Sequence, residues 1–293
     1  MHSKRQIQQL LAAAGASPKK KLGQHFLIDL NLLNLVADSP GITPDDVVLE
    51  IGCGTGSMTQ TLAQKARTVI AVEYDPVLAA IAAEQLKDAP NTLILNCDAM
   101  AGKSSLNPTV KDAIDSAAEH ATGRLLLVAN LPYCVASAII VNMAAGPIVA
   151  DEMHITVQKE VAHRITAQPG QDEYGPMAIL LAAAGNAQID RILKPTVFWP
   201  QPQVDSALVH FVRDPAKITQ VSDFDLLADV VNLFMGHRRK TMQACTKLAA
   251  STLAQTHDWP AIFAAASIDP TLRPDQLHPR QYVELANRCH TPQ

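Results

Sequence analysis

Short apolar runs alternate with helix-like stretches between residues 46 and 212 of this chain. The runs are rich in Val, Ile and Leu, as in strands that are buried on both faces of a parallel sheet. Their alternation with helices predicts βαβ units and therefore a Rossmann-like α/β fold with a mostly parallel sheet. The expected strands are Val47–Ile51, Thr68–Val72, Thr92–Leu95, Leu125–Ala129 and His154–Val157. The expected helices are Ser57–Lys65, Pro76–Leu86 and Thr109–His120.

The pattern changes towards the C-terminus. Two further strands, Ala187–Leu193 and Ala207–Val212, flank a proline-rich loop and are expected to give the sheet an antiparallel end. After residue 214 only helical patterns follow, at Asp223–Met235, Arg238–Leu253, Trp259–Ser267 and Arg280–Arg288. The predicted parts are an N-terminal extension over residues 1–18, an α/β domain over 19–214 and a small α-helical domain over 221–293.

Composition places the chain among globular proteins of the cytoplasm. A hydrophobic fraction of 48% over 293 residues is enough for a sizeable core. No apolar run reaches the roughly 18 to 20 residues that span a membrane. The first residues lack the apolar core of a secretory signal, and Ile7–Ala16 is compatible with a short helix. The 5 cysteines are scattered without zinc spacing, which predicts reduced thiols and no metal site.

The distribution of charge matters more than its sum. The net charge of −4 argues against general affinity for nucleic acid. However, no acidic residue precedes Asp29, and a second basic cluster follows His237. Such patches hold phosphates on chains that are acidic overall, although each one alone is more often solvated surface. The candidate RNA contacts are Lys19, Lys20, Lys21, Arg238, Arg239 and Lys240.

Three successive strand ends carry residues suited to one ligand. The loop Glu50–Gly56 places glycines between a strand and a helix, where the backbone can approach a ligand closely. Glu73 ends the second strand, where an acid accepts from both ribose hydroxyls, and Asp98 follows the third, where it can accept from an adenine amine. A tight turn without a ligand remains the alternative for the loop alone. Because a Walker lysine and a basic partner for pyrophosphate are missing, S-adenosylmethionine fits better than NAD or ATP.

The fourth strand runs into Asn130–Tyr133. The Asn130 side-chain oxygen and the Leu131 carbonyl can accept both hydrogens of adenine N6 and aim its lone pair at a sulfonium methyl group. Tyr133 can stack on the base, and Phe198 can form the second wall of the pocket. An adenine within a duplex cannot reach such a pocket, so the substrate must be unpaired or flipped. An ordinary turn at Asn130–Tyr133 and a core position for Phe198 are the alternatives.

Taken together, these segments resemble the KsgA/RsmA family of small-subunit ribosomal RNA adenine dimethyltransferases. The resemblance runs from about Lys19 to Ala286. The segments that carry it are Lys21–Leu27, Glu50–Gly56, Asn130–Tyr133, Gln158–Val161, Phe198–Ser206 and Arg238–Thr241. It implies an S-adenosylmethionine-dependent class I methyltransferase that dimethylates N6 of two adjacent adenosines near the 3′ end of 16S-type RNA. A role in small-subunit assembly and a monomeric state are further expectations.

The resemblance also implies residue roles. The cofactor site would consist of His25, Leu27, Gly52, Gly54, Glu73, Asp98 and Asn130. The target adenine would be held by Asn130, Leu131, Tyr133 and Phe198. Arg238–Lys240 would lie on a helix that faces ribosomal RNA. Two departures stand at the site, because Cys134 follows the Tyr where the family usually has Asn, and Cys53 replaces a common Pro.

Two alternatives stay open. An Erm-type 23S rRNA adenine methyltransferase shares most of these motifs, although Phe198–Ser206 and the helical tail favour the small-subunit enzyme. A non-catalytic RNA-binding assembly or transcription factor on the same fold is a rival of another class. The complete Asn130–Tyr133 segment argues against lost catalysis.

Overall fold

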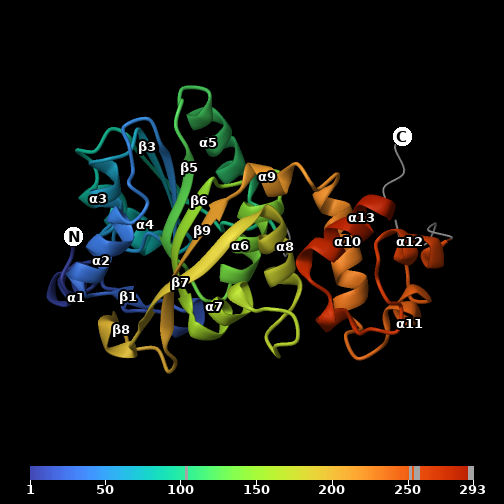
Figure 1. Cartoon of the computed structure of the whole chain (residues 1–293). Helices are drawn as coiled ribbons and strands as arrows, with labels where there is room; N and C mark the ends of the chain where they lie inside the picture. The colour runs from blue at the N-terminus through green and yellow to red at the C-terminus, as the bar shows by residue number, and fades with distance from the viewer. Residues whose placement is uncertain (103–104, 251–252, 254–257, 290–293) are drawn as a thin grey trace. The chain divides into compact units, whose positions relative to one another are not determined.

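The computed structural model describes residues 1–102, 105–250, 253 and 258–289 (Figure 1). The chain forms two compact units. The first contains Met1–Met143, Pro147–Ala162 and Gln188–Val212. The second contains Ala144–Gly146, His163–Ala187 and Arg213–Gln293, so it includes a segment from within the α/β region as well as the C-terminal helices.

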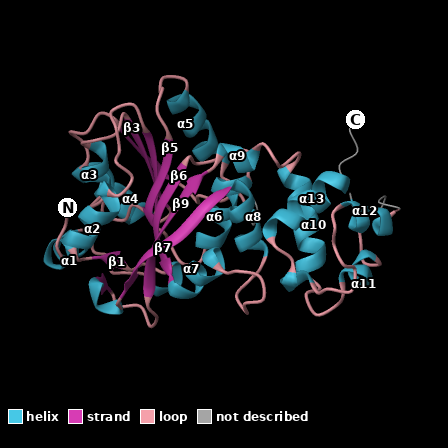
Figure 2. Cartoon of the chain, viewed as in Figure 1, coloured by secondary structure: helices cyan, strands magenta, loops and turns pink. Residues whose placement is uncertain are grey.

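A seven-stranded sheet in the order β4-β3-β2-β5-β6-β9-β7 is the centre of the fold (Figure 2). The strands are β2 (Val47–Ile51), β3 (Thr68–Glu73), β4 (Thr92–Asn96), β5 (Leu125–Asn130), β6 (Glu152–Gln158), β7 (Gly185–Leu193) and β9 (Ser206–Arg213). The strands from β4 to β6 pair in parallel, and β9 pairs antiparallel with β6. Every strand expected from the apolar runs is present, and the mostly parallel α/β prediction is confirmed.

Helices cover both faces of this sheet (Figure 1). On one side lie α2 (Leu30–Asp38), α3 (Thr59–Ala63) and α4 (Pro76–Gln85). On the other lie α5 (Pro108–Ala118) and α6 (Ala136–Ala145). Burial from both sides explains why β2, β3 and β5 are nearly pure Val, Ile and Leu. The sequence pattern did not predict α6, because it is apolar almost all round and lacks a helical period.

The N-terminal segment is built into the first unit. The helix α1 (Lys4–Ala13) starts at Ser3, whose side chain accepts from the Gln6 backbone N–H in a capping box. Ile7 and Leu11 are buried and pack in one cluster with Leu78 and Ile81 of α4. The short helix expected within residues 7–16 is therefore present, three residues earlier than its apolar positions indicate.

Two very short strands were not expected. These are β1 (Phe26–Leu27) and β8 (Phe198–Trp199), which pair antiparallel with Leu27 opposite Phe198. Two residues are too few for an alternating pattern to be visible in the sequence. The pairing joins two of the family-like segments, which are far apart along the chain.

The second unit is helical. Its helices include α8 (Pro176–Ala184), α9 (Pro215–Ile218), α10 (Phe224–Met235), α11 (Met242–Thr246), α12 (Trp259–Ala265) and α13 (Pro279–Cys289). The helix α7 (Lys159–Thr166) is divided between the two units. Phe234 lies edge-on to Trp259, with ring centroids 5.7 Å apart. The buried Tyr282 hydroxyl donates to the Pro274 carbonyl at 2.7 Å, which links α13 to the turn before it. Among the described residues, none of the helices is long and apolar enough to cross a membrane.

The helix predicted over Arg238–Leu253 is wrong. Only Met242–Thr246 is α-helical, and residues 251–252 of the predicted span lie outside the described residues. Thr241 is the reason for the late start, because its side chain accepts from the Ala244 backbone N–H while its own backbone is extended, with φ −73° and ψ 158°. The basic residues Arg238–Lys240 therefore lie in a turn before α11 and not on a helix.

Candidate active site

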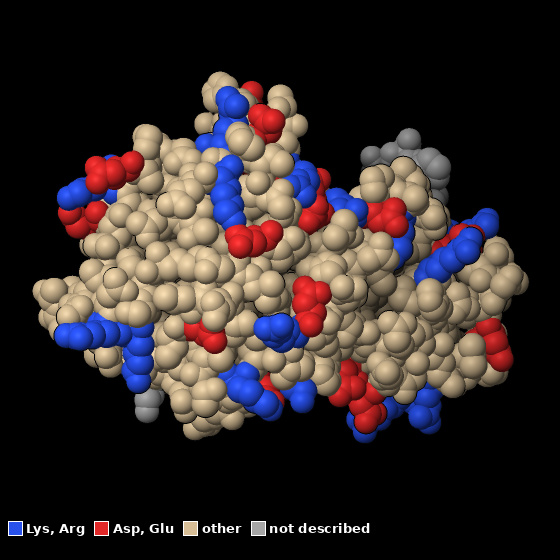
Figure 3. All heavy atoms as spheres, turned by 60° about the vertical axis from the view of Figure 1, so that its left-hand side comes forward, with Lys and Arg blue, Asp and Glu red and all other residues tan. Residues whose placement is uncertain are grey.

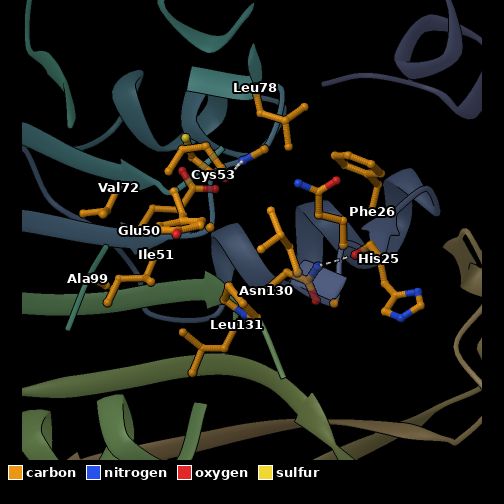
Figure 4. Close-up of a pocket in the computed structure, with 18 of the residues that line it drawn as sticks. His25, Phe26, Glu50, Ile51, Cys53, Val72, Leu78, Ala99, Asn130 and Leu131 are labelled. Carbon is orange, nitrogen blue, oxygen red and sulfur yellow. Dashed lines mark hydrogen bonds between the residues drawn. The ribbon is translucent and has the colours of Figure 1, made fainter. Parts of the chain in front are cut away.

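A cavity of about 330 Å³ lies at the carboxyl ends of the parallel strands. Its wall contains the glycine loop after β2, the end of β3 with Glu73, the residues after β4 with Asp98, and the segment after β5. Gly23–Leu27 and Ile7 of α1 complete it. Figure 4 shows Glu50, Cys53 and Val72 on one side, His25 and Phe26 on the other, and Asn130 and Leu131 between them.

The glycine loop packs directly against the segment after β5. Gly52 has a φ of +80°, in the region that favours glycine. A Cβ atom at this position would lie 2.8 Å from Cγ of Pro132. Both the backbone angle and the lack of space therefore require glycine at 52, and the two segments that line the cavity hold one another in place.

Glu73 ties the end of β3 to the glycine loop. One carboxylate oxygen accepts from the Gly54 backbone N–H at 2.9 Å, and the other accepts from the Asp75 N–H at 2.8 Å. The side chain is 7% exposed, and burial raises the pKa of its carboxyl group against the lowering effect of those hydrogen bonds. Each oxygen keeps one lone pair for a further donor, as a pair of ribose hydroxyls would require.

Glu50 is a functional candidate that the residue-by-residue predictions missed. It is 2% exposed on β2, and its Oε2 atom has no hydrogen-bond partner among the residues that the structure describes. Burial, reinforced by the nearby Glu73 carboxylate, raises the pKa of Glu50 to about 8. A buried carboxyl oxygen without a partner in a cavity wall is suited to a ligand that brings a donor or a positive charge. The signal in the sequence was a single acid within the apolar strand Val47–Ile51.

Asp98 lies at the exposed edge of the same cavity. One of its oxygens accepts from the Met100 backbone N–H at 2.9 Å, which holds the side chain in a turn after β4. The second oxygen is left for an amine donor. Cys97, Cys134 and the buried Cys53 also line the cavity, and burial raises the pKa of the Cys53 thiol.

The Asn130 amide is held at both ends. Its Nδ2 atom donates to the His25 carbonyl oxygen at 2.8 Å (Figure 4), and its Oδ1 atom accepts from the Thr156 hydroxyl at 2.5 Å. A carbonyl can only accept, so the nitrogen must face His25 and the oxygen must face Thr156. The Asn130 side chain therefore has a defined orientation, and its role as an acceptor for adenine N6 stays a prediction.

Leu131 and Tyr133 follow in the same loop. The Leu131 backbone N–H donates to the Thr156 carbonyl at 3.1 Å, and its side chain is buried. The Tyr133 ring stacks on His25, with centroids 5.4 Å apart, and its hydroxyl shares a hydrogen bond of 2.7 Å with Ser206. Since His25 covers one face of the Tyr133 ring, a base could stack only on the other.

Phe198 is placed differently from the prediction. It is 1% exposed, packs in the core with Leu27 and Leu208, and is not among the residues that line the cavity. The β1–β8 pairing is the reason, because it sets Phe198 directly opposite Leu27, which does line the cavity. In this structure Phe198 therefore supports the pocket from behind and forms no wall for a base.

The residues predicted to contact RNA differ in whether their side chains already have partners within the protein. Lys19 forms an ion pair of 2.8 Å with Asp75, and Arg238 donates to the Asp172 carbonyl and lies 3.4 Å from Asp275. The side chain of Lys20 lies outside the described part of the structure. Lys19, Lys21, Arg239 and Lys240 are exposed, and Arg238 is partly buried. Figure 3 shows basic and acidic side chains interspersed on the face in view, in agreement with the modest net charge.

Comparison with known proteins decides the family. Residues 15–289 match the family described as ribosomal RNA adenine dimethylase. The chain belongs to this family. The Ribosomal RNA small subunit methyltransferase A of Pediococcus pentosaceus is 35% identical over 284 residues, which cover 95% of this chain and 92% of that protein. The protein of the same name from Bifidobacterium adolescentis is 36% identical and covers 96% of this chain and 91% of its own length.

Solved structures show the same fold for this adenine dimethylase. A dimethyladenosine transferase from Plasmodium falciparum superposes with a TM-score of 0.67 at 20% identity, covering 87% of this chain and 94% of that one. The 23S rRNA methyltransferase ErmE superposes with a TM-score of 0.60 at 22% identity, covering 90% and 98%. The family resemblance, the methyltransferase fold and the enzyme class expected from the sequence are confirmed.

Proposed function

We propose that this adenine dimethylase transfers methyl groups from S-adenosylmethionine to N6 of two adjacent adenosines near the 3′ end of small-subunit ribosomal RNA. The observation that carries the proposal is the doubly anchored amide of Asn130, a residue that lines the same cavity as Glu50, Glu73 and Asp98. The names of the relatives, which specify the small ribosomal subunit, support the substrate. We further propose that the protein acts as a monomer during subunit assembly.

The residues of the cavity fit S-adenosylmethionine. Glu73 has lone pairs for two ribose hydroxyls, and Asp98 has a free carboxylate oxygen for the adenine amine. The unpartnered Glu50 Oε2 suits a molecule that carries a positive charge on its methionine part. When bound, the cofactor supplies a methyl group on a positively charged sulfur, which is the electrophile. His25, Leu27, Gly52 and Gly54 would shape the remaining wall.

Catalysis would then rest on orientation. The Asn130 oxygen and the Leu131 carbonyl accept the two N6 hydrogens and turn the nitrogen lone pair towards the methyl group. The Asn130 acceptor is fixed before the substrate arrives, so little reorganisation of this group remains to be done in the transition state. Each methylation leaves a positive charge on N6, which makes a proton of N6 acidic enough to pass to solvent without a strong base.

The RNA would enter as an unpaired strand. A target base that has left the helix can stack on the free face of Tyr133, while the exposed Lys21, Arg239 and Lys240 contact phosphates. Lys19 and Arg238 would join them only by giving up their ion pairs with Asp75 and Asp275.

The test is incubation of the protein with radiolabelled S-adenosylmethionine and three substrates: undermethylated 30S subunits, 50S subunits and naked RNA. We expect label in 30S RNA, recovered as N6,N6-dimethyladenosine after digestion. Label only in 50S RNA would replace the proposal with an Erm-type activity. Tight 30S binding without label in any substrate would identify a non-catalytic assembly factor.

A further inference from the structure

Thr156 on β6 contacts the Asn130 side chain and the backbone of Leu131, the two residues that supply the acceptors of the proposed reaction. Its hydroxyl donates to the Asn130 side-chain oxygen, and its backbone carbonyl accepts from the Leu131 N–H at 3.1 Å. It is 0% exposed and does not line the cavity. We propose that Thr156 is a positioning residue whose hydroxyl sets the direction of the Asn130 acceptor towards adenine N6; this inference rests on the proposed methyl transfer.

The two hydrogen bonds of the Asn130 amide have different effects on its orientation. The His25 carbonyl selects which end of the amide is the nitrogen, because an oxygen facing that carbonyl would be repelled. One hydrogen bond alone would still let the amide plane swing about it. The Thr156 hydroxyl fixes the other end, so the plane and the free lone pair of Oδ1 have one direction.

The lone pairs of Oδ1 explain why direction matters. An amide oxygen has two, and Thr156 occupies one of them. The remaining lone pair can accept a single hydrogen of N6. In the second transfer N6 has only one hydrogen left, so the reacting lone pair is then aimed by a single acceptor contact. Misorientation should therefore slow the second transfer more than the first.

The position depends on strand register and on the type of side chain. Parallel pairing of β5 with β6 places Thr156 beside Asn130. A β-branched residue suits a buried strand, and threonine adds a hydroxyl to the volume of valine. The isosteric Thr156→Val removes only the donor, and Thr156→Ser keeps the donor with a smaller side chain. Thr92→Val on β4 is a matched control, because the buried Thr92 hydroxyl has no partner among the described residues.

The experiment compares these variants with the wild type in steady-state methylation of undermethylated 30S subunits, with separate analysis of mono- and dimethyladenosine. For Thr156→Val we expect kcat to fall about tenfold, KM for both substrates to change less than about twofold, and the monomethyl fraction to rise. Thr156→Ser should recover most of kcat, and Thr92→Val should match the wild type. If Thr156→Val melts below the assay temperature, Thr156→Ala serves in the same comparison.

The possible results distinguish the role of Thr156 from the proposed function of the enzyme. A Thr156→Val enzyme with kcat within twofold of the wild type and an unchanged product ratio would overturn the role of Thr156 and leave the proposed function standing. A loss of kcat that Thr156→Ser does not recover would show a packing role and would also overturn it. Wild-type protein that places no label in 30S RNA would refute the proposed function itself.

Discussion

Glu50 makes the affinity for S-adenosylmethionine depend on pH. Its side chain is buried and its pKa is raised to about 8, so the carboxyl group of the ligand-free enzyme is about 90% protonated at pH 7. A cationic ligand favours the ionised form, and binding must therefore expel that proton. Lowering the pH below 8 should therefore weaken the binding of S-adenosylmethionine, and raising the pH towards 8 should strengthen it.

The magnitude follows from the ionised fraction of Glu50. With a pKa of about 8, this fraction is about 0.01 at pH 6.0 and about 0.24 at pH 7.5, so Kd should fall about 25-fold over that range. The range ends below the pKa of a typical α-amino group, about 7.7 to 8.0, so the ligand keeps its charge for most of it. At pH 7 binding should release about 0.9 proton from Glu50.

Isothermal titration calorimetry can measure both quantities. Kd is determined at several values between pH 6.0 and 7.5, and proton release is obtained from buffers with different ionisation enthalpies. Glu50→Gln, which cannot ionise, should bind weakly and with little dependence on pH. A wild-type Kd that is constant across this range would refute the reasoning.

Substitutions at three further positions test the packing and the chemistry of the site. Gly52→Ala, which meets Pro132 at a left-handed backbone position, should lower the free energy of unfolding by about 1–3 kcal/mol in chemical denaturation and weaken cofactor binding; unchanged stability would contradict the contact. Asn130→Ala should abolish methyl transfer with an unchanged circular dichroism spectrum, and near-normal turnover would remove its assigned role. Phe198→Ala should cost about 3–5 kcal/mol of stability because the ring is buried, whereas Phe198→Leu should keep substantial activity. A folded but inactive Phe198→Leu enzyme would instead support a contact between this ring and the base.

The predictions that succeeded are those that depend on local patterns and on one general property of parallel sheets. Every strand of the large sheet was identified, and the clearest signals were the apolar runs of β2, β3 and β5, where burial on both faces leaves little choice of residue type. The carboxyl ends of parallel strands meet at one edge, which is why Glu73, Asp98 and Asn130 could be assigned to a common site although they are distant in sequence.

The predictions that failed depend on contacts between distant segments. Phe198 could not be placed in the core from its neighbours, because the pairing of β8 with β1 decides which way its ring faces. The helix predicted over Arg238–Leu253 was wrong because an apolar pattern does not reveal that Thr241 acts as a cap. The sequence did not reveal the ion pair of Lys19 with Asp75, and the contact of Lys19 with phosphate stays a prediction.

The sequence by itself predicted the α/β architecture, the family, and candidate residues for binding an adenosine and for accepting hydrogen bonds from the target adenine. These predictions depend on periodicity and on short contiguous motifs. Only the tertiary structure decided the proton affinity and the orientation of their side chains. Burial beside Glu73 sets the proton affinity of Glu50, and the register of β5 with β6 brings Thr156 to Asn130. Both effects act through space between residues of different strands, and their physical cause is the exclusion of water when the sheet and its loops close around the cavity.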